Sequence, residues 1–352
     1  MSSQANLATD WRAGYGPIAH RSETIERMQA LVQRLVAQRR IADEASAHAL
    51  LAAADRVACT AMSVVAHMTY ARRIDRSGCP LGSDDFKQTP EGHTGGSLNM
   101  VPAFVGYLLA NALTGTTRGW LMGQGHCVAA IEAVNALTGD VSAAQRGRYD
   151  RSEAGLSRLI EDFYSYAIDK QGRPAVPLGS HAGPNTAGAI SEGGYLGFAG
   201  LQYVHTPLPG ESLVAFLSDG AFEEQRGSDW APRWWRAEDC GFAIPVMILN
   251  GRRIEQRTQI VQEGGAAWLA EDLRHNGFDP VIIDGRDPVA IAWAIVESED
   301  TLSAFAAQSN RRYPVKFPYV IAETEKGFGF PGAATNAAHN LPLDGNPREH
   351  AQ

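Results

Sequence analysis

Two apolar runs in the sequence each end at a polar side chain that carries a potential ligand oxygen. Residues 213–217 lead through one serine into Asp219 and Gly220, and residues 244–249 lead directly into Asn250. If the runs are neighbouring strands of a parallel sheet, Asp219 and Asn250 meet at its carboxyl edge, where open α/β sheets bind ligands. A carboxylate and an amide oxygen suit Mg²⁺, which takes few protein ligands and completes its shell with phosphate oxygens and water. The strand ends therefore predict a magnesium-bound diphosphate, with close approach of backbone amides at Gly220.

Histidines in glycine-rich segments form a second group of residues suited to chemistry. His93 lies in segment 91–96, and His126 closes segment 123–126. Histidine suits general acid-base work because its neutral and charged forms are both accessible near neutral pH. The surrounding glycines would let a ligand approach the backbone closely. The two segments predict proton transfer at a bound substrate, with structural hydrogen bonding as the alternative for each histidine.

The elements that would position these residues alternate along the chain beyond residue 92. Short β-branched or aromatic runs predict strands at residues 119–122, 213–217, 244–249, 281–283 and 319–322. Helical spacing predicts helices at residues 98–113, 126–137, 152–166, 194–203, 266–275 and 288–297. This alternation is typical of parallel βαβ units, so we predict an α/β fold with a doubly wound, mostly parallel sheet flanked by helices.

The N-terminal part of the chain is predicted to be a helical extension. Apolar residues at helical spacing indicate one helix at residues 22–39, and an alanine-rich stretch indicates another at residues 43–73. We therefore divide the chain into a helical extension, residues 1–80, and a diphosphate- and magnesium-binding domain, residues 81–352. Residues 140–190 are rich in glycine, proline and polar residues, which predicts a long excursion over the mouth of the site.

Composition excludes several other classes of protein. The 352 residues are 44% hydrophobic, enough for a substantial core, and the formal net charge of -8 argues against broad nucleic-acid binding. The four cysteines are far apart and have neither metal-ligand spacing nor a dense disulfide framework. The polar start lacks the features of a signal peptide, and the most apolar helix candidate contains Asp55 and Arg56. We expect a cytoplasmic protein without a membrane span.

The ordered motifs resemble those of thiamine-diphosphate enzymes. Ser218, Asp219 and Gly220 followed by Asn250 are similar to the Gly-Asp-Gly to Asn signature of those enzymes. Further segments follow in the order seen in phosphoketolases, at residues 91–96, 123–126, 180–184, 191–194, 249–251, 325–329 and 339–343. The phosphoketolase motif order covers residues 88–343, most of the chain. The resemblance to transketolases is weaker but follows the same arrangement of motifs.

The resemblance implies roles for four histidines. His93 and His126 match the histidines that flank the thiazolium ring and contact the hydroxyls and carbonyl of the substrate. His339 resembles the histidine near the diphosphate and the reacting centre, with an ordinary surface position as its alternative. His181 resembles the phosphoketolase histidine on the opposite wall.

The same resemblance implies the residues that hold the cofactor and its metal. Thiamine diphosphate would be bound by Gly125, Gly193, Asp219, Gly220, Asn250 and Lys326. Mg²⁺ would be coordinated by Asp219, Asn250 and the backbone carbonyl of Arg252. For Lys326, a solvated side chain is the alternative to pairing with an anionic ligand.

Two departures from the family pattern and one further match matter. Ser218 replaces the usual first glycine, so the backbone there is less free. Glu224 lies where transketolases place a carboxylate of an acid network between subunits, but an exposed glutamate in a first helical turn is an equal alternative. Phosphoketolases and transketolases also carry a second domain, which binds the aminopyrimidine and supplies the glutamate that activates it. The sequence contains no such domain.

The implied function is thiamine-diphosphate- and Mg²⁺-dependent cleavage of a ketose, such as a sugar phosphate, with transfer of a two-carbon unit. Because the activating glutamate is missing, we expect a separately encoded partner subunit and a hetero-oligomer, unless the chain is part of a longer protein. A non-catalytic cofactor-binding or regulatory subunit is one alternative. An NAD-dependent oxidoreductase is another, but residues 123–125 match its glycine-rich turn only in part.

Overall fold

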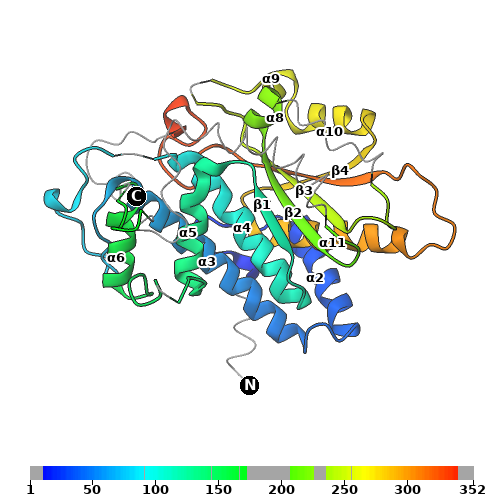
Figure 1. Ribbon diagram of the computed structural model, residues 1–352, viewed down its shortest axis with the longest axis horizontal. Helices are drawn as coiled ribbons and strands as arrows, with labels where there is room; N and C mark the ends of the chain where they lie inside the picture. Colours follow the sequence, from blue (N-terminus) through cyan, green and yellow to red (C-terminus); the bar gives the residue numbers. More distant parts are fainter. Residues whose placement is uncertain are drawn as a thin grey trace.

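A parallel β-sheet forms the centre of the molecule. The computed structural model describes residues 11–90, 92–143, 145–165, 167–172, 207–225, 235–254 and 256–339. In spatial order the strands are β1 (Gly119–Met122), β2 (Ser212–Ser218), β3 (Phe242–Leu249), β5 (Phe317–Glu323) and β4 (Phe278–Asp284), each parallel to its neighbours (Figure 1). The predicted strands and the parallel α/β class are confirmed.

Helices precede the sheet and connect its strands. The N-terminal half contains η1 (Trp11–Ala13), α2 (Ser22–Ala37), α3 (Glu44–Tyr70), η2 (Ser83–Asp85), α4 (Thr94–Thr114), η3 (Gly125–Cys127), α5 (Val128–Thr138) and α6 (Glu153–Asp162). The C-terminal half contains α8 (Asp219–Gln225), α9 (Gln259–Glu263), α10 (Ala266–His275), α11 (Pro288–Ala306) and η5 (Asn336–His339). The helix predicted at residues 194–203 and the last part of the predicted excursion, residues 173–190, lie outside the described residues. The described part of the excursion contains α6.

One predicted helix is longer than expected. The prediction ended α11 at residue 297, but the helix continues to Ala306. Its polar continuation is stable because the charged side chains have partners. Glu299 forms an ion pair with the buried Arg118 and accepts a hydrogen bond from Ser212 Oγ at 2.6 Å. A polar run that is satisfied inside the protein therefore need not mark a helix end.

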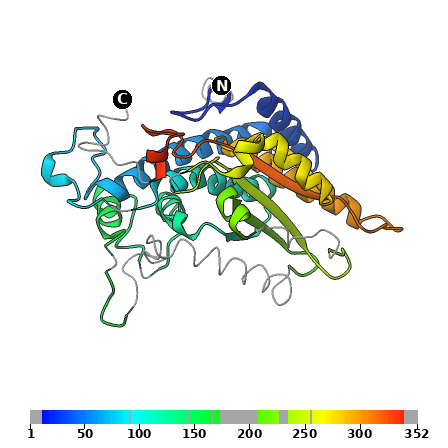
Figure 2. The same ribbon diagram turned by 90° about the horizontal axis from the view of Figure 1, so that it is seen from above.

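Helices cover both faces of the sheet, as the doubly wound prediction requires. Along β3, Val246 and Ile248 belong to the core shared with α3, α4 and α11, whereas Met247 and Leu249 belong to the core shared with α10. This alternation is the two-residue period of a strand buried on both sides. Figure 1 shows α10 on the opposite side of the sheet from α2 and α3, and Figure 2 views the molecule from the side of α10.

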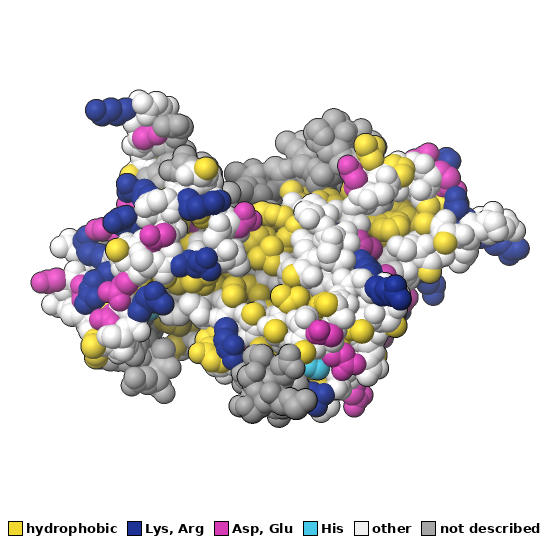
Figure 3. Space-filling view, turned by 90° about the horizontal axis from the view of Figure 1, so that it is seen from below, with side chains coloured by type: hydrophobic (Ala, Val, Ile, Leu, Met, Phe, Trp, Pro, Cys, Tyr) yellow, Lys and Arg dark blue, Asp and Glu magenta, His cyan; other side chains and the backbone are white. Residues whose placement is uncertain are grey.

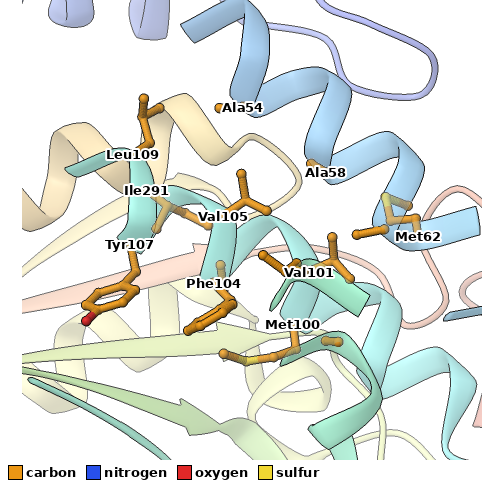
Figure 4. Packing of buried hydrophobic residues seen from close by; sticks show 14 of the residues in the cluster. Ala54, Ala58, Met62, Met100, Val101, Phe104, Val105, Tyr107, Leu109 and Ile291 are labelled. Atoms are coloured by element: carbon orange, nitrogen blue, oxygen red, sulfur yellow. The ribbon is translucent and has the colours of Figure 1, made fainter. Parts of the chain in front are cut away.

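Helix α4 is the buried centre of the larger core. Figure 4 shows Val101 and Val105 of α4 directed toward the small side chains of Ala54 and Ala58 on α3. Gly106 lets α11 approach closely, because a Cβ atom there would lie 2.7 Å from the Cβ of Ile291. Close packing at these small residues fixes the start of α4, where the predicted site begins.

Both α3 and α4 are long and apolar enough to cross a membrane. In the protein, 83% of the most apolar window of α4 and 56% of that of α3 is buried. Their apolar surfaces thus form the core between the N-terminal helices and the sheet.

Candidate active site at the carboxyl edge of the sheet

The ends of β2 and β3 converge through the side chain of Asp219. This residue begins α8 directly after β2, and its side chain is buried. Its Oδ2 accepts a hydrogen bond from the backbone N–H of Gly251 at 2.6 Å, and its Oδ1 accepts one from Gly220 at 3.0 Å. Because Gly251 immediately follows Asn250, the predicted meeting of the two strand ends is confirmed.

The environment of Asp219 disfavours a bare negative charge. Burial raises the pKa of this carboxyl to about 7, although the backbone hydrogen bonds from Gly251 and Gly220 and the charge of Lys326 act to lower it. A buried carboxyl of this kind is stabilised in its ionised form by a nearby cation. A divalent ion placed here would keep Asp219 ionised throughout the neutral range.

Asn250 begins a turn that presents polar backbone atoms at the same edge. Its Oδ1 accepts a hydrogen bond from the backbone N–H of Arg252 at 3.0 Å. Gly251 has a φ of 79°, and a Cβ atom there would lie 2.9 Å from Cγ2 of Val261, so glycine fits this turn far better than any other residue. The loop closes where the N–H of Thr258 donates to the carbonyl of Gly251 at 3.0 Å.

A salt bridge that the sequence analysis missed holds this turn against α8. Nε and Nη2 of Arg253 donate to Oε2 of Glu223 at 3.1 and 2.5 Å, and Oε1 of Glu223 accepts the backbone N–H of Ile260 at 2.6 Å. The sequence does contain a signal for this salt bridge. An acidic pair, Glu223 and Glu224, follows Asp219-Gly220, and a basic pair, Arg252 and Arg253, follows Asn250-Gly251. Glu224 lies in α8, but its side chain is outside the described part of the chain.

Three of the four predicted histidines form one cluster. The ring of His93, just before α4, lies 5.0 Å from that of His126 in η3 and 4.8 Å from that of His339 at the end of η5, measured between ring centroids. Residues far apart in the sequence are thus brought within contact distance. His339 takes part in this cluster, so the alternative of an unconnected surface histidine is wrong.

The surroundings favour the neutral imidazoles of His126 and His339. Burial lowers the pKa of His126 to about 3, with further lowering by His93, Lys326 and His339. Burial also lowers the pKa of His339 to about 3, assisted by the charge of Lys326. A neutral imidazole offers one donor and one acceptor nitrogen, which suits hydrogen bonding to substrate hydroxyl and carbonyl groups.

Lys326 connects the histidine cluster to the turn after β3. The side chain is buried, so the alternative of a solvated lysine is wrong. Its Nζ donates to the backbone carbonyl of Arg253 at 2.6 Å and lies 3.1 Å from Nδ1 of His339. Burial lowers the pKa of Lys326 to about 8, although the Asp219 carboxylate opposes this shift. The ammonium is the positive group nearest to where an anionic ligand would bind.

Two adjacent glycines allow these parts to close on α4. A Cβ atom on Gly95 would lie 1.8 Å from the carbonyl oxygen of Ala338, and one on Gly96 would lie 3.3 Å from Nε2 of His126. The thiol of Cys127 also packs against Gly96, and burial raises its pKa to about 12, which makes it unreactive. Cys127 was not identified from the sequence.

The remaining predicted cofactor residues are placed only in part. Gly125 is buried in η3, and the space around Gly220 is open, because a Cβ atom there would only reach normal contact with Arg253. His181 and Gly193 lie outside the described residues.

The donor set fits Mg²⁺ held with a phosphate ligand. Among the residues that the structure describes, no three His, Cys, Asp or Glu side chains are grouped so as to hold a metal alone. The carboxylate of Asp219, the amide of Asn250 and a carbonyl of the turn are hard oxygen donors, and a cation here would need further oxygens from a ligand and water. The site therefore fits the predicted metal and diphosphate.

The chain is similar to known proteins over most of its length. The model of the XFP N-terminal domain matches residues 46–352. A probable phosphoketolase 2 of Lactiplantibacillus plantarum is 26% identical over 296 residues, 77% of this chain and 35% of that protein. A probable phosphoketolase of Streptomyces coelicolor is 28% identical over 301 residues, 78% of this chain and 36% of that protein.

Among solved structures, a transketolase variant from Pichia stipitis aligns with a TM-score of 0.46 at 18% identity, covering 80% of this chain and 37% of that one. The chain thus spans about a third of the length of the curated relatives it matches. Since the family model covers most of the sequence, the chain belongs to the XFP N-terminal domain family and is a distant relative of phosphoketolases.

Proposed function

We propose that this chain binds thiamine diphosphate and Mg²⁺ at the carboxyl edge of its sheet and takes part in the cleavage of a ketose with transfer of a two-carbon unit. The observation that carries the proposal is the convergence of Asp219 with the turn at Asn250 beside the buried histidine cluster. Asp219, Asn250 and the backbone carbonyl of Arg252 would hold the metal, and Lys326 would face the anionic ligand.

The protein residues have a limited set of tasks in this proposal. When bound, thiamine diphosphate supplies the nucleophilic carbon and stabilises the negative charge left by carbon-carbon cleavage. His93 and His126, with neutral imidazoles available in the cluster, orient the substrate carbonyl and move protons on its hydroxyls. Lys326 holds His339 in place and keeps positive charge at the inner end of the site.

A partner subunit is part of the proposal. The family members named above are about three times as long as the part that this chain matches, and the resemblance places the aminopyrimidine site and activating glutamate in a second domain. Figure 3 shows hydrophobic side chains gathered across the middle of one face. Apolar patches of this kind mark interaction surfaces. We therefore propose a cytoplasmic hetero-oligomer with a separately encoded subunit.

Asp219→Ala tests the cofactor site. The substitution removes the buried carboxylate that would bind the metal, so Mg²⁺-dependent binding of thiamine diphosphate should be lost while the protein stays folded. Isothermal titration calorimetry with and without Mg²⁺ measures this effect on the chain with its partner. Asp279→Ala, at an exposed position of β4, is the control and should bind normally. Cofactor affinity within about twofold of wild type in Asp219→Ala would contradict the assignment.

A ketose-cleavage assay tests the partner. Each chain should be nearly inactive alone, and mixing the two should restore activity, because the activating glutamate would lie in the partner. Robust cleavage by this chain alone would contradict the split-enzyme proposal. Cofactor binding without cleavage in the assembled pair would instead favour the non-catalytic subunit.

A further inference from the structure

The segment at residues 11–21 packs beside the loop that carries two site residues. It precedes residue 46, where the match to the XFP N-terminal domain begins, so the family resemblance gives it no role. Trp11 and Ile18 are buried in the main core, and a short antiparallel bridge joins Tyr15 to Ile18. The segment is thus an integral part of the fold.

His20 clamps this segment between two helices. Its Nε2 lies 3.0 Å from Oδ2 of Asp55 on α3, and its Nδ1 lies 3.0 Å from Oδ2 of Asp287, the residue that caps α11. All three side chains are buried, and the Trp11 ring lies 5.6 Å from the imidazole. A buried imidazolium between two carboxylates fixes the segment in one position.

Arg21 makes a second connection, which leads to the site loop. Its Nε lies 3.0 Å from Oδ2 of Asp284 at the end of β4. The same carboxylate accepts two hydrogen bonds from Arg286, at 2.8 Å each, and the Arg286 guanidinium lies 5.6 Å from the ring of Phe328. Phe328 is two residues beyond Lys326.

Pro17 lies beside the loop at Gly329. A Cβ atom on Gly329 would lie 2.5 Å from Cε of Met62 and 3.5 Å from Cγ of Pro17, so the backbone of the loop passes close to the segment and to α3. Gly329 has a φ of 78°, a conformation that costs glycine nothing and other residues much more. The loop therefore depends on its neighbours to hold this shape.

The loop at residues 326–339 is also held by backbone hydrogen bonds and by the site itself, including a hydrogen bond that Nη1 of Arg252 donates to Oδ1 of Asn336. The N–H of Ala334 donates to the carbonyl of Lys326 at 2.9 Å, and the N–H of Gly327 donates to the carbonyl of Gly95 at 3.3 Å. The ring of Phe330 stacks on that of Tyr70 at 6.3 Å. The loop begins at Lys326 and ends at His339, so its shape sets the distance between these two side chains.

We propose that residues 11–21 are a positioning element that holds the loop at residues 326–339, and with it Lys326 and His339, in the site. His20, Arg21 and Pro17 act through the loop and are positioning residues. The proposal does not depend on which ligand the site binds, because it concerns the order of the loop in the chain itself.

Hydrogen–deuterium exchange on the full chain tests the proposal. Arg21→Ala should speed exchange in peptides from residues 327–338 by about tenfold or more, while exchange in β3 stays unchanged. Arg34→Ala is the matched control, because it removes the ion pairs of α2 with Glu297 and Asp300 on α11 but touches neither segment nor loop. The control should leave the loop unchanged.

Two outcomes would overturn the proposal. One is unchanged exchange of the loop in Arg21→Ala. The side chain of Arg21 is half-exposed, so this substitution should not unfold the protein. The other is faster exchange of the loop only together with faster exchange of β3, which would show a general loss of stability. Because no cofactor is added, a failure of cofactor binding would leave this result intact.

Discussion

The described part of the molecule contains buried histidines in two different electrostatic environments. His20 lies between Asp55 and Asp287, and hydrogen bonds and charge from these carboxylates raise its pKa to about 10, although burial alone acts to lower it. In the site, burial lowers the pKa of His126 and His339 to about 3, and the surrounding cations and imidazoles add to that effect. The surroundings of His20 therefore favour the charged imidazole, and those of His126 and His339 favour the neutral one.

The difference shows that partners, and not burial, decide what a buried histidine does. A charged imidazole paired with two carboxylates has fixed hydrogen bonds and serves the fold. Neutral imidazoles beside the ammonium of Lys326 keep the ability to donate and to accept, and they serve a ligand. Substitutions in the two groups should therefore affect different measurements.

A large effect is expected from Asp55→Ala. The substitution should lower the free energy of unfolding by about 3 kcal/mol, because the buried His20 would lose one of its two carboxylate partners. Chemical denaturation of the chain measures the change. Asp75→Ala, an aspartate at the surface of another loop, serves as the control. A loss below about 1 kcal/mol would mean that the pair with Asp287 alone fixes His20.

His93→Ala and His126→Ala should show the converse pattern. We expect each to lower turnover by about a hundredfold or more with cofactor affinity and stability near wild type, because general acid-base groups act on the transition state. Turnover of the assembled pair with its partner, thermal unfolding and calorimetry together measure the three quantities. Near-normal turnover in both variants would assign the histidines a structural role.

His20 should also make stability depend on pH. Its pKa is about 10 in the folded protein and has its ordinary value of 6.5 in the unfolded chain, so the stability it contributes is complete below pH 6.5 and is lost as pH rises through about 10. The difference in melting temperature between wild type and His20→Gln should shrink over that range. Taking the difference removes the opposite contribution of Lys326, whose pKa is lowered. A constant difference would show that His20 is not protonated in the fold.

The sequence was sufficient to predict that Asp219 and Asn250 lie together at the ends of neighbouring strands. Asp219 and Asn250 each follow an apolar strand directly, and parallel strands that neighbour one another bring their ends together by geometry. The motif order likewise identified His93, His126 and His339 as parts of one site. These predictions depend on residues whose positions follow from local strand and helix patterns.

Other features depend on contacts that leave no local signal. His20 follows a turn and looks like a surface residue, but its partners are 35 residues away at Asp55 and much further away at Asp287. Lys326 lies in a glycine-rich loop typical of the surface, but it is buried where that loop packs on α4 and on its other neighbours. Contacts between residues far apart in the sequence bury both His20 and Lys326. The hydrophobic periodicity of the sequence does not reveal such contacts.

The clamp around His20 joins parts of the chain that are synthesised at different times. Translation produces Trp11 and His20 first and Asp55 soon after, but Asp284 and Asp287 belong to the last third of the sequence. Until those residues leave the ribosome, the segment has only part of its binding site and its apolar side chains remain accessible to chaperones. Contacts between such distant residues also form slowly, because a long loop must close first. We therefore expect the N-terminal segment to dock late in the folding of this protein.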